Sequence, residues 1–278
     1  MSRPKPSPAG SPTFEVVTIT PEAAEGLLAR NTHNRRIKKS NLQKVTRALT
    51  NGEWQLNGEA IKIAKDGTIL DGQHRLVGVV QTGVPMQTLM IQGLEHATQE
   101  TMDTGSPRST ADVLKLRGEE NSVVLAAIAK KVRLASLYGV RAAVSNSYVV
   151  TTSEIVRTVD EFPHLREVAK QAMHVAANTG MTGSLAGLLI YLFDEIDKND
   201  SEFFFERLST GELLAQGHPI YELRKVLTQV KAIRGQKSMT FIAAVAIKAW
   251  NKYRDGETVN LLKFTVGGAN PEAFPEPK

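Results

Sequence analysis

The sequence predicts an α+β protein, with a mixed α/β domain at the N-terminal end and an all-helical domain after it. Two observations lead to this prediction. Runs of β-branched residues alternate with helical patterns over roughly the first hundred residues. Beyond Ser109 the apolar segments all have the i, i+3/i+4 spacing of helices and are separated by Gly or Pro. The predicted boundaries are a lead at 1–13, a first domain at 14–108, a helical domain at 109–265 and a tail at 266–278.

The first elements follow from local signals. The lead, MSRPKPSPAGSPT, is rich in Pro and Ser and is expected to be disordered. A strand is predicted at residues 14–20, FEVVTIT, because β-branched residues dominate there. Thr20 is a good helix cap, Pro21 suits the first helical position, and Glu22 complements the positive end of the helix dipole. We therefore expect a helix from here to about Asn31.

A second helix is predicted over residues 39–52, KSNLQKVTRALTNG. Either Ser40 or Asn41 is expected to cap its start, and Asn51-Gly52 should end it. Its apolar residues fall on one face, and they are Leu42, Val45 and Leu49.

A hairpin is predicted next, from AIKIA to TIL, with Asp66-Gly67 as its two-residue loop. QHRLVGVVQTG then predicts a short helix that ends at Gly83, and MQTLMIQGL predicts a strand at 86–94. The first domain should close with a short helix at HATQETMDTG and a loop at GSPR. Trp54 is expected to anchor the core, with base stacking as the weaker alternative.

The helical domain should contain eight helical segments. They are TADVLKLRG, NSVVLAAIAKKVRLASLYG, TTSEIVRTVDEFP, HLREVAKQAMHVAANTG, SLAGLLIYLFDEID, SEFFFERLSTG, PIYELRKVLTQVKAIRG and MTFIAAVAIKAWNKYRDG. The final residues, VGGANPEAFPEPK, are expected to form an exposed tail.

Composition excludes several kinds of chemistry. The chain has no cysteine, which rules out disulfides, thiolate metal sites and a cysteine nucleophile. Its apolar runs are too short to span a bilayer and its N-terminal segment has no apolar core like that of a signal peptide, so we expect a cytoplasmic protein without membrane contact. The net charge is +5 and the pI is near 9.3, a balance that favours an anionic partner.

The positive charge is concentrated in one stretch. Residues 30–47, RNTHNRRIKKSNLQKVTR, contain seven basic residues and no acidic one. Such a stretch is either a solvated helix face or a phosphate-binding patch for a nucleotide or a nucleic acid. The candidate nucleic-acid contacts within it are Lys38, Lys39, Lys44 and Arg47.

The most polar cluster of the first domain lies in residues 68–76, TILDGQHRL, where a predicted strand meets a predicted helix. A helix N-terminus offers unpaired N–H groups and partial positive charge, and thus attracts anions. Gly72 would allow a phosphate to approach the backbone closely, and His74 and Arg75 would add side-chain donors. The alternative is an ordinary tight turn followed by a polar helical turn.

The DGQHR segment resembles the nucleotide-binding motif of the ParB/sulfiredoxin superfamily, Gly-x-x-Arg at a strand-to-helix junction. Gly72 and Arg75 match the shared positions, and His74 matches the His of the sulfiredoxin and free-serine-kinase forms. NTHNRR, at 31–36, is similar to the first box of partition proteins, and the order of elements over residues 14–105 also agrees. The whole pattern looks like that of ParB-like proteins encoded by phages and prophages.

This resemblance implies a nucleoside triphosphate, CTP or ATP, bound with Mg²⁺, together with NTPase activity and DNA as a partner. The implied nucleotide-binding residues, with the loop MDTGSPRS included, are Gly72, Gln73, His74, Arg75, Asn31, Asn34, Arg35, Arg36, Asp103 and Arg108. Gln73 occupies the position of the sulfiredoxin cysteine, so that chemistry is excluded. The loop residues Asp103 and Arg108 have an alternative reading, as parts of an ordinary helix end and helix start.

Kinase members of the superfamily require a carboxylate base, which is also a good ligand for magnesium. The candidate catalytic residues here are Asp71, Glu59, Glu53 and His74, with Asp71 also the candidate Mg²⁺ ligand. Three functions therefore stay open: a ParB-like nucleotide-dependent DNA-binding protein, a phosphotransferase acting on a hydroxyl of a modified base or small molecule, and a ParB-like nuclease. The resemblance to partition proteins also implies a DNA-binding helix-turn-helix unit and a dimerisation module after the first domain, but no segment of the helical half has a clear pattern of either. DNA binding by the helical domain at 109–265 and a homodimer therefore stay open alternatives.

Overall fold

The computed structural model describes residues 11–30, 37–102, 108–145, 147–232, 238–265 and 272–278. Over these residues the chain has twelve α-helices, a short 3₁₀ helix and one four-stranded sheet, which confirms that it is a mixed α and β protein. It divides into two compact units, Met1–Pro107 and Arg108–Lys278.

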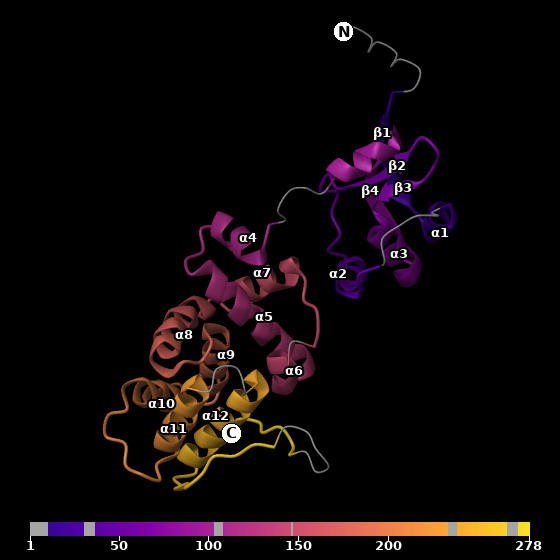
Figure 1. The fold of residues 1–278 in the computed structure, drawn as a ribbon. Helices are drawn as coiled ribbons and strands as arrows, with labels where there is room; N and C mark the ends of the chain where they lie inside the picture. Colours follow the sequence, from indigo (N-terminus) through magenta and orange to yellow (C-terminus); the bar gives the residue numbers. More distant parts are fainter. Residues whose placement is uncertain (1–10, 31–36, 103–107, 146, 233–237, 266–271) are drawn as a thin grey trace. The chain divides into compact units, whose positions relative to one another are not determined.

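The first unit is built on a mixed sheet (Figure 1). Its strands lie in the order β1 (Thr13–Ile19), β4 (Met86–Leu94), β2 (Ala60–Ala64) and β3 (Ile69–Asp71). β1 pairs with β4 and β2 with β3 in antiparallel fashion, whereas β2 and β4 run parallel. The chain can join these parallel strands because β3 and a helix supply the crossover between them.

Three helices pack in this unit: α1 (Pro21–Ala29), α2 (Lys39–Thr50) and α3 (Gln73–Thr82). The predicted start of α1 is confirmed, since the Thr20 hydroxyl accepts a hydrogen bond from the N–H of Ala23 at 3.2 Å. α1 and α2 both pack against α3. The buried core joins all three helices to the sheet, and its members are Ile19, Ala24, Leu49, Ile61, Ile63, Ile69, Leu76, Val79, Met86 and Met90.

Two local predictions for this unit are wrong. The N-cap of α2 is Lys38, without a side-chain capping bond, whereas Ser40 and Asn41 lie inside the first helical turn. The hairpin loop also has three residues instead of two, because the Ala64 N–H bonds to the Thr68 carbonyl at 2.8 Å. Gly67, with φ of 88°, supplies the left-handed residue that a three-residue loop of this kind requires.

The segment after β4 is a 3₁₀ helix, η1 (His96–Thr101). Gln99 fixes it to the sheet, because its amide donates to the Leu70 carbonyl at 3.2 Å. Trp54 packs against the core and its indole N–H donates to the Gln87 carbonyl at 2.8 Å, as its expected anchoring role requires.

The second unit is helical throughout its described residues. Its helices are α4 (Thr110–Leu116), α5 (Ser122–Tyr138), α6 (Val140–Ser145), α7 (Thr152–Glu161), α8 (Leu165–Thr179), α9 (Gly183–Asp194), α10 (Lys198–Thr210), α11 (Pro219–Ala232) and α12 (Met239–Arg254). The short helix α6 was not predicted. α10 starts earlier than predicted because Asp197 caps it, accepting from the Asp200 N–H at 3.0 Å.

Helix α9 is the centre of this unit. It packs against α5, α8, α10 and α12, which explains why its sequence is apolar nearly all round. The Phe193 ring on α9 stacks on Trp250 of α12 with centroids 4.2 Å apart, and both side chains are fully buried.

The last described segment, residues 272–278, has exposed and half-buried side chains and also makes contacts with α12. The Trp250 indole N–H donates a hydrogen bond to the Lys278 carbonyl at 2.9 Å. The rings of Phe274 and Phe264 are in edge-to-face contact, with their centroids 5.8 Å apart. Glu272 forms an ion pair with Lys248 of α12. Within the described parts of the chain, no helix has both the length and the apolar character needed to cross a membrane.

Candidate functional site: the junction of β3 and α3

The DGQHR segment forms the strand-to-helix junction that the sequence predicts. Asp71 ends β3, Gly72 is the N-cap of α3, and Gln73 is its first residue. Gly72 has φ of 99°, and a Cβ there would lie 3.0 Å from Ile61 Cγ1 and 3.2 Å from Ile61 Cα. Glycine is therefore required by the left-handed backbone and by the close approach of β2. Gly72 is itself buried, so its first role is in packing.

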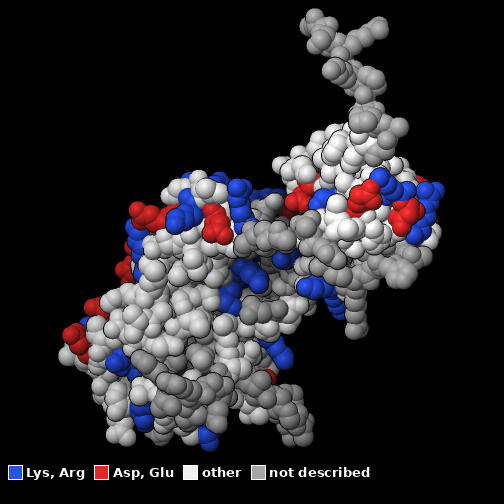
Figure 2. Space-filling view, turned by 45° about the horizontal axis from the view of Figure 1, so that its top comes forward, with Lys and Arg blue, Asp and Glu red and all other residues white. Residues whose placement is uncertain are grey.

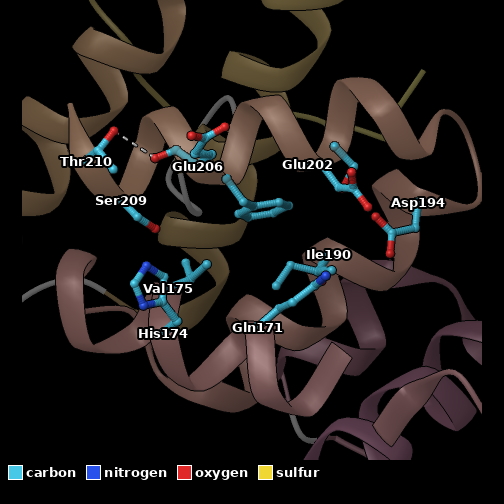
Figure 3. Close-up of a pocket in the computed structure, with 11 residues that line it drawn as sticks. Gln171, His174, Val175, Ile190, Asp194, Glu202, Glu206, Ser209 and Thr210 are labelled. Carbon is cyan, nitrogen blue, oxygen red and sulfur yellow. Dashed lines mark hydrogen bonds between the residues drawn. The ribbon is translucent and has the colours of Figure 1, made fainter. Parts of the chain in front are cut away.

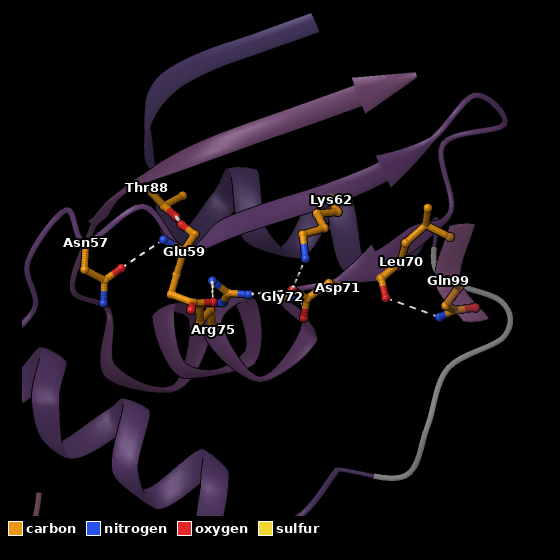
Figure 4. Close-up of polar contacts among 9 residues, drawn as sticks. All are labelled: Asn57, Glu59, Lys62, Leu70, Asp71, Gly72, Arg75, Thr88 and Gln99. Atoms are coloured by element: carbon orange, nitrogen blue, oxygen red, sulfur yellow. Dashed lines mark hydrogen bonds and ion pairs between the residues drawn. The ribbon is translucent and has the colours of Figure 1, made fainter. Parts of the chain in front are cut away.

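Asp71 is the most heavily partnered side chain of the junction (Figure 4). Its Oδ1 accepts from the Gly72 N–H at 2.6 Å. Its Oδ2 lies 3.1 Å from Arg75 Nη2 and 3.3 Å from Lys62 Nζ. Two cations thus already balance this carboxylate, and a magnesium ion at Oδ2 would have to compete with both.

Arg75 is turned inward. Its side chain is only 11% exposed, and its guanidinium lies between Asp71 and Glu59, whose Oε2 is 3.5 Å from Nη1. Because two of its five donors face carboxylates, Arg75 in this arrangement fixes the positions of the acids. The predicted direct contact with phosphate would use its other donors.

Glu59 differs from Asp71 in its exposure. Its side chain is 66% exposed, yet its backbone is fixed: the carbonyl accepts from Thr88 Oγ1 at 2.9 Å, and the N–H donates to Asn57 Oδ1 at 3.0 Å. Glu59 is therefore the solvent-accessible carboxylate of the junction, held on a rigid support.

His74 connects the junction to the start of α2. Its Nε2 accepts a hydrogen bond from the main-chain N–H of Lys38 at 3.0 Å. Lys38 is the N-cap of α2, and His74 lies in the first turn of α3. Since Nε2 is the acceptor, the neutral ring carries its proton on Nδ1. The positive ends of two helix dipoles therefore meet at one place.

The candidate nucleic-acid residues lie on α2 and at its start. Lys38, Lys39 and Lys44 are exposed and Arg47 is half-buried, while Leu49 of the same helix is in the core. On the face drawn in Figure 2, some lysine and arginine side chains lie beside acidic ones and others lie apart from them, so the net charge of +5 does not by itself mark a nucleic-acid surface.

The structure brings some candidates together and leaves others apart. Asp71, Gly72, Arg75 and Glu59 form one cluster, and His74 joins Lys38 to it. Glu53 follows the C-terminal end of α2, about 18 Å along the helix from its N-terminal end. Arg108 begins the second unit. The other candidates lie outside the described residues: Asn31, Asn34, Arg35, Arg36 and Asp103.

Sequence reasoning missed Lys62. It pairs with Asp71 across the β2–β3 ladder, and its ammonium contacts the Asp71 carboxylate. The signal was present, because Lys62 is the one charged residue in the apolar run AIKIA. Within the described parts of the chain, no group of three or more His, Asp or Glu side chains is placed to hold a metal ion.

Comparisons with models of known families, with curated proteins and with solved structures find no match for this chain. The fold and the junction together define a class of site: a strand-to-helix turn in a mixed α/β unit, where two helix N-termini, an arginine and two carboxylates meet.

Proposed function

We propose that the first unit binds the phosphates of a nucleoside triphosphate, CTP or ATP, where α2 and α3 begin, and that the protein is a ParB-like, nucleotide-dependent DNA-binding protein with NTPase activity. The hydrogen bond from Lys38 to His74 carries this proposal, because it brings two helix N-termini to one place. Aligned N–H groups at helix N-termini are ready-made anion sites.

The charges at the start of α2 support an anionic ligand. Lys38 and Lys39 stand at the positive end of the helix dipole, and α2 has no acidic residue in its first turn and no side-chain cap. This arrangement is unfavourable by itself, since cations stabilise the opposite end of a helix. A phosphate bound at this helix start would offset the unfavourable interaction between the lysines and the helix dipole.

The carboxylates of the junction fit a magnesium–phosphate ligand in part. Glu59 is exposed and rigidly supported. Its carboxylate is therefore better placed to bind a metal ion than that of Asp71, which two cations already contact. When bound beside phosphates, magnesium supplies charge neutralisation across their oxygens.

DNA is the proposed macromolecular partner. Lys39 and Lys44 are exposed on α2, and the stretch 30–47 contains no acidic residue. Contacts of this kind bind DNA phosphates without reading sequence, and they weaken steeply as salt is added.

The alternative function is a phosphotransferase of the same fold. The observation that favours it is the exposed Glu59 carboxylate beside the Arg75 guanidinium, 3.5 Å apart, because a transferred phosphoryl group needs both a cation and a base for the acceptor hydroxyl. No comparable observation favours the third hypothesis, a nuclease.

The test is calorimetry of the full chain against the four nucleoside triphosphates, with and without Mg²⁺ and duplex DNA. We expect one of CTP and ATP to bind, and the double variant Lys38→Gln/Lys39→Gln to bind it at least about tenfold more weakly, the effect of losing charge-assisted contacts. These substitutions keep the Lys38 N–H and hence its bond to His74.

Lys115→Gln is the matched control, because Lys115 is an exposed lysine on α4 of the other unit. Binding of no triphosphate, or equal binding by the double variant, would contradict the proposal. Release of diphosphate only after a hydroxyl acceptor is added would favour the phosphotransferase, and DNA binding that does not depend on salt would argue against the DNA-binding role.

A further inference from the structure

The second unit contains a pocket of about 330 Å³ between α8, α9 and α10 (Figure 3). This volume is at the lower end of the roughly 300–1,000 Å³ typical of small-molecule sites. Apolar side chains line its walls, namely Val175, Ile190 and Phe205. Its polar lining includes Gln171, His174, Asp194, Ser201, Glu202, Glu206 and Ser209.

One serine hydroxyl in this pocket is buried without a partner. Ser209 is 7% exposed, and its Oγ has no hydrogen-bond partner, whereas the buried Ser201 hydroxyl lies beside the Asp194 carboxyl and lowers its pKa. A helical serine ordinarily returns its hydroxyl to the preceding turn, and a buried hydroxyl without a partner costs about 1–3 kcal/mol. The Ser209 hydroxyl points from α10 into the space facing α8 (Figure 3), where a ligand could satisfy it.

One end of the pocket is acidic. The carboxylates of Asp194 and Glu202 face each other there (Figure 3). Burial raises the pKa of Asp194, and the like charge of Glu202 raises it further, against the opposing effects of Ser201, Lys198 and His164. The nearest ion-pair partner of Glu202 is Lys198 at 3.8 Å, and both of these side chains are more than half exposed, so the cation is weakly held.

The distance between the two polar ends defines a ligand length. Ser201 and Glu202 lie one turn into α10, and Ser209 lies near its C-terminal end. Ser209 lies seven positions after Glu202 in the helix, which corresponds to a rise of about 10 Å. The buried ring of Phe205 lies between them on the same helix.

We propose that this pocket binds a small organic amine with an apolar or aromatic body. Its ammonium group lies between Asp194 and Glu202, its body packs on Phe205 and Ile190, and a hydroxyl or second donor at the far end bonds to Ser209. The pocket is within the second unit, so this site is independent of the nucleotide site proposed for the first.

The experiment compares three probes by calorimetry on the full chain: tyramine, its neutral alcohol analogue tyrosol, and phenethylamine, which lacks the distal hydroxyl. We expect tyramine to bind more tightly than either analogue. Glu202→Gln is at an exposed position and should not affect folding. It is expected to weaken the binding of tyramine by about tenfold, as loss of a charge-assisted contact does. Glu167→Gln, an exposed carboxylate on α8 outside the pocket lining, is the matched control.

Ser209→Ala tests the contact with the ligand's distal hydroxyl separately from the contact with its ammonium group. Because it removes a buried hydroxyl without a partner, it should leave the free protein as stable or more stable, and it should abolish the preference for tyramine over phenethylamine. Equal binding of tyramine and tyrosol, no binding of either amine, or unchanged tyramine binding by Glu202→Gln would overturn the proposal.

Discussion

The Nε2 atom of His74 accepts a hydrogen bond from the main-chain N–H of Lys38 at 3.0 Å, and this contact joins the first turns of two helices that lie 36 residues apart in the chain. Neither N-cap residue, Lys38 or Gly72, caps its helix with a side chain of its own. His74 therefore does for α2 what a capping side chain ordinarily does, and it fixes where the positive ends of both helices lie.

His74→Ala should affect ligand binding more than folding. The lost hydrogen bond is expected to cost about 0.5–1.5 kcal/mol in the free energy of unfolding. The start of α2 is then no longer held at α3, so triphosphate binding should weaken by a larger factor. Urea unfolding and calorimetry measure the two effects. His96→Ala, at an exposed site on η1, is the control, and an equal effect of both substitutions on binding would contradict this role.

Gly72→Ala is expected to destabilise the first unit strongly. The new Cβ would meet Ile61 Cγ1 at 3.0 Å in a backbone of φ 99°, so a steric cost of about 1–3 kcal/mol adds to the left-handed penalty of about 1–2 kcal/mol. Gly58→Ala is the matched control, because Gly58 also has positive φ, at 85°, but has nothing within 4 Å. Urea unfolding should show the larger loss for Gly72, and equal losses would refute the packing role.

Gly187→Ala should destabilise the second unit although alanine favours helices. Its Cβ would lie 2.5 Å from Ile128 Cγ1, where α9 packs on α5, and overpacking of about 1–3 kcal/mol exceeds a helix-propensity gain of about 1 kcal/mol. Gly26→Ala on α1 has nothing within 4 Å and should instead stabilise. Thermal unfolding of both variants shows whether the two changes in stability have opposite signs. Stabilisation by Gly187→Ala would contradict this prediction and show that α5 moves aside at little cost.

Lys131 should make stability depend on pH above neutrality. The side chain is 4% exposed, and burial together with the charge of Lys130 lowers its pKa to about 8. Between pH 8 and about 10.5 the unfolded chain binds more protons than the folded chain at this residue, so stability rises with pH. Below pH 8 this contribution is lost, because the ammonium is charged in both states.

The measurement is urea unfolding at pH 7.5 and pH 9.5. We expect this residue to contribute a gain of about 2 kcal/mol at the higher pH, and Lys131→Met should lack it. Lys170→Met, at a side chain that is 55% exposed, should keep the pH dependence. A Lys131→Met protein with an unchanged pH dependence would show that other groups cause it.

Much of the local structure could be read from the chain. Thr20 and Pro21 mark the start of α1, Gly83 ends α3, and the strand at 86–94 has the predicted bounds. The failures share a physical cause. Ser40 and Asn41 are good caps by residue type. The helix nevertheless begins at Lys39, where the main chain of Lys38 is bonded to a histidine on another helix. Local preference does not include such long-range partners.

The sequence by itself determined that a glycine, a histidine and an arginine follow a strand end, because residue types and their periodicity are local properties. Only the tertiary structure decided what these residues contact. Burial turns Arg75 toward Asp71 and Glu59, the strand register brings in Lys62, and packing of α2 on α3 gives His74 its donor. These contacts depend on distances between segments far apart in the chain, and such distances are fixed by packing of the core.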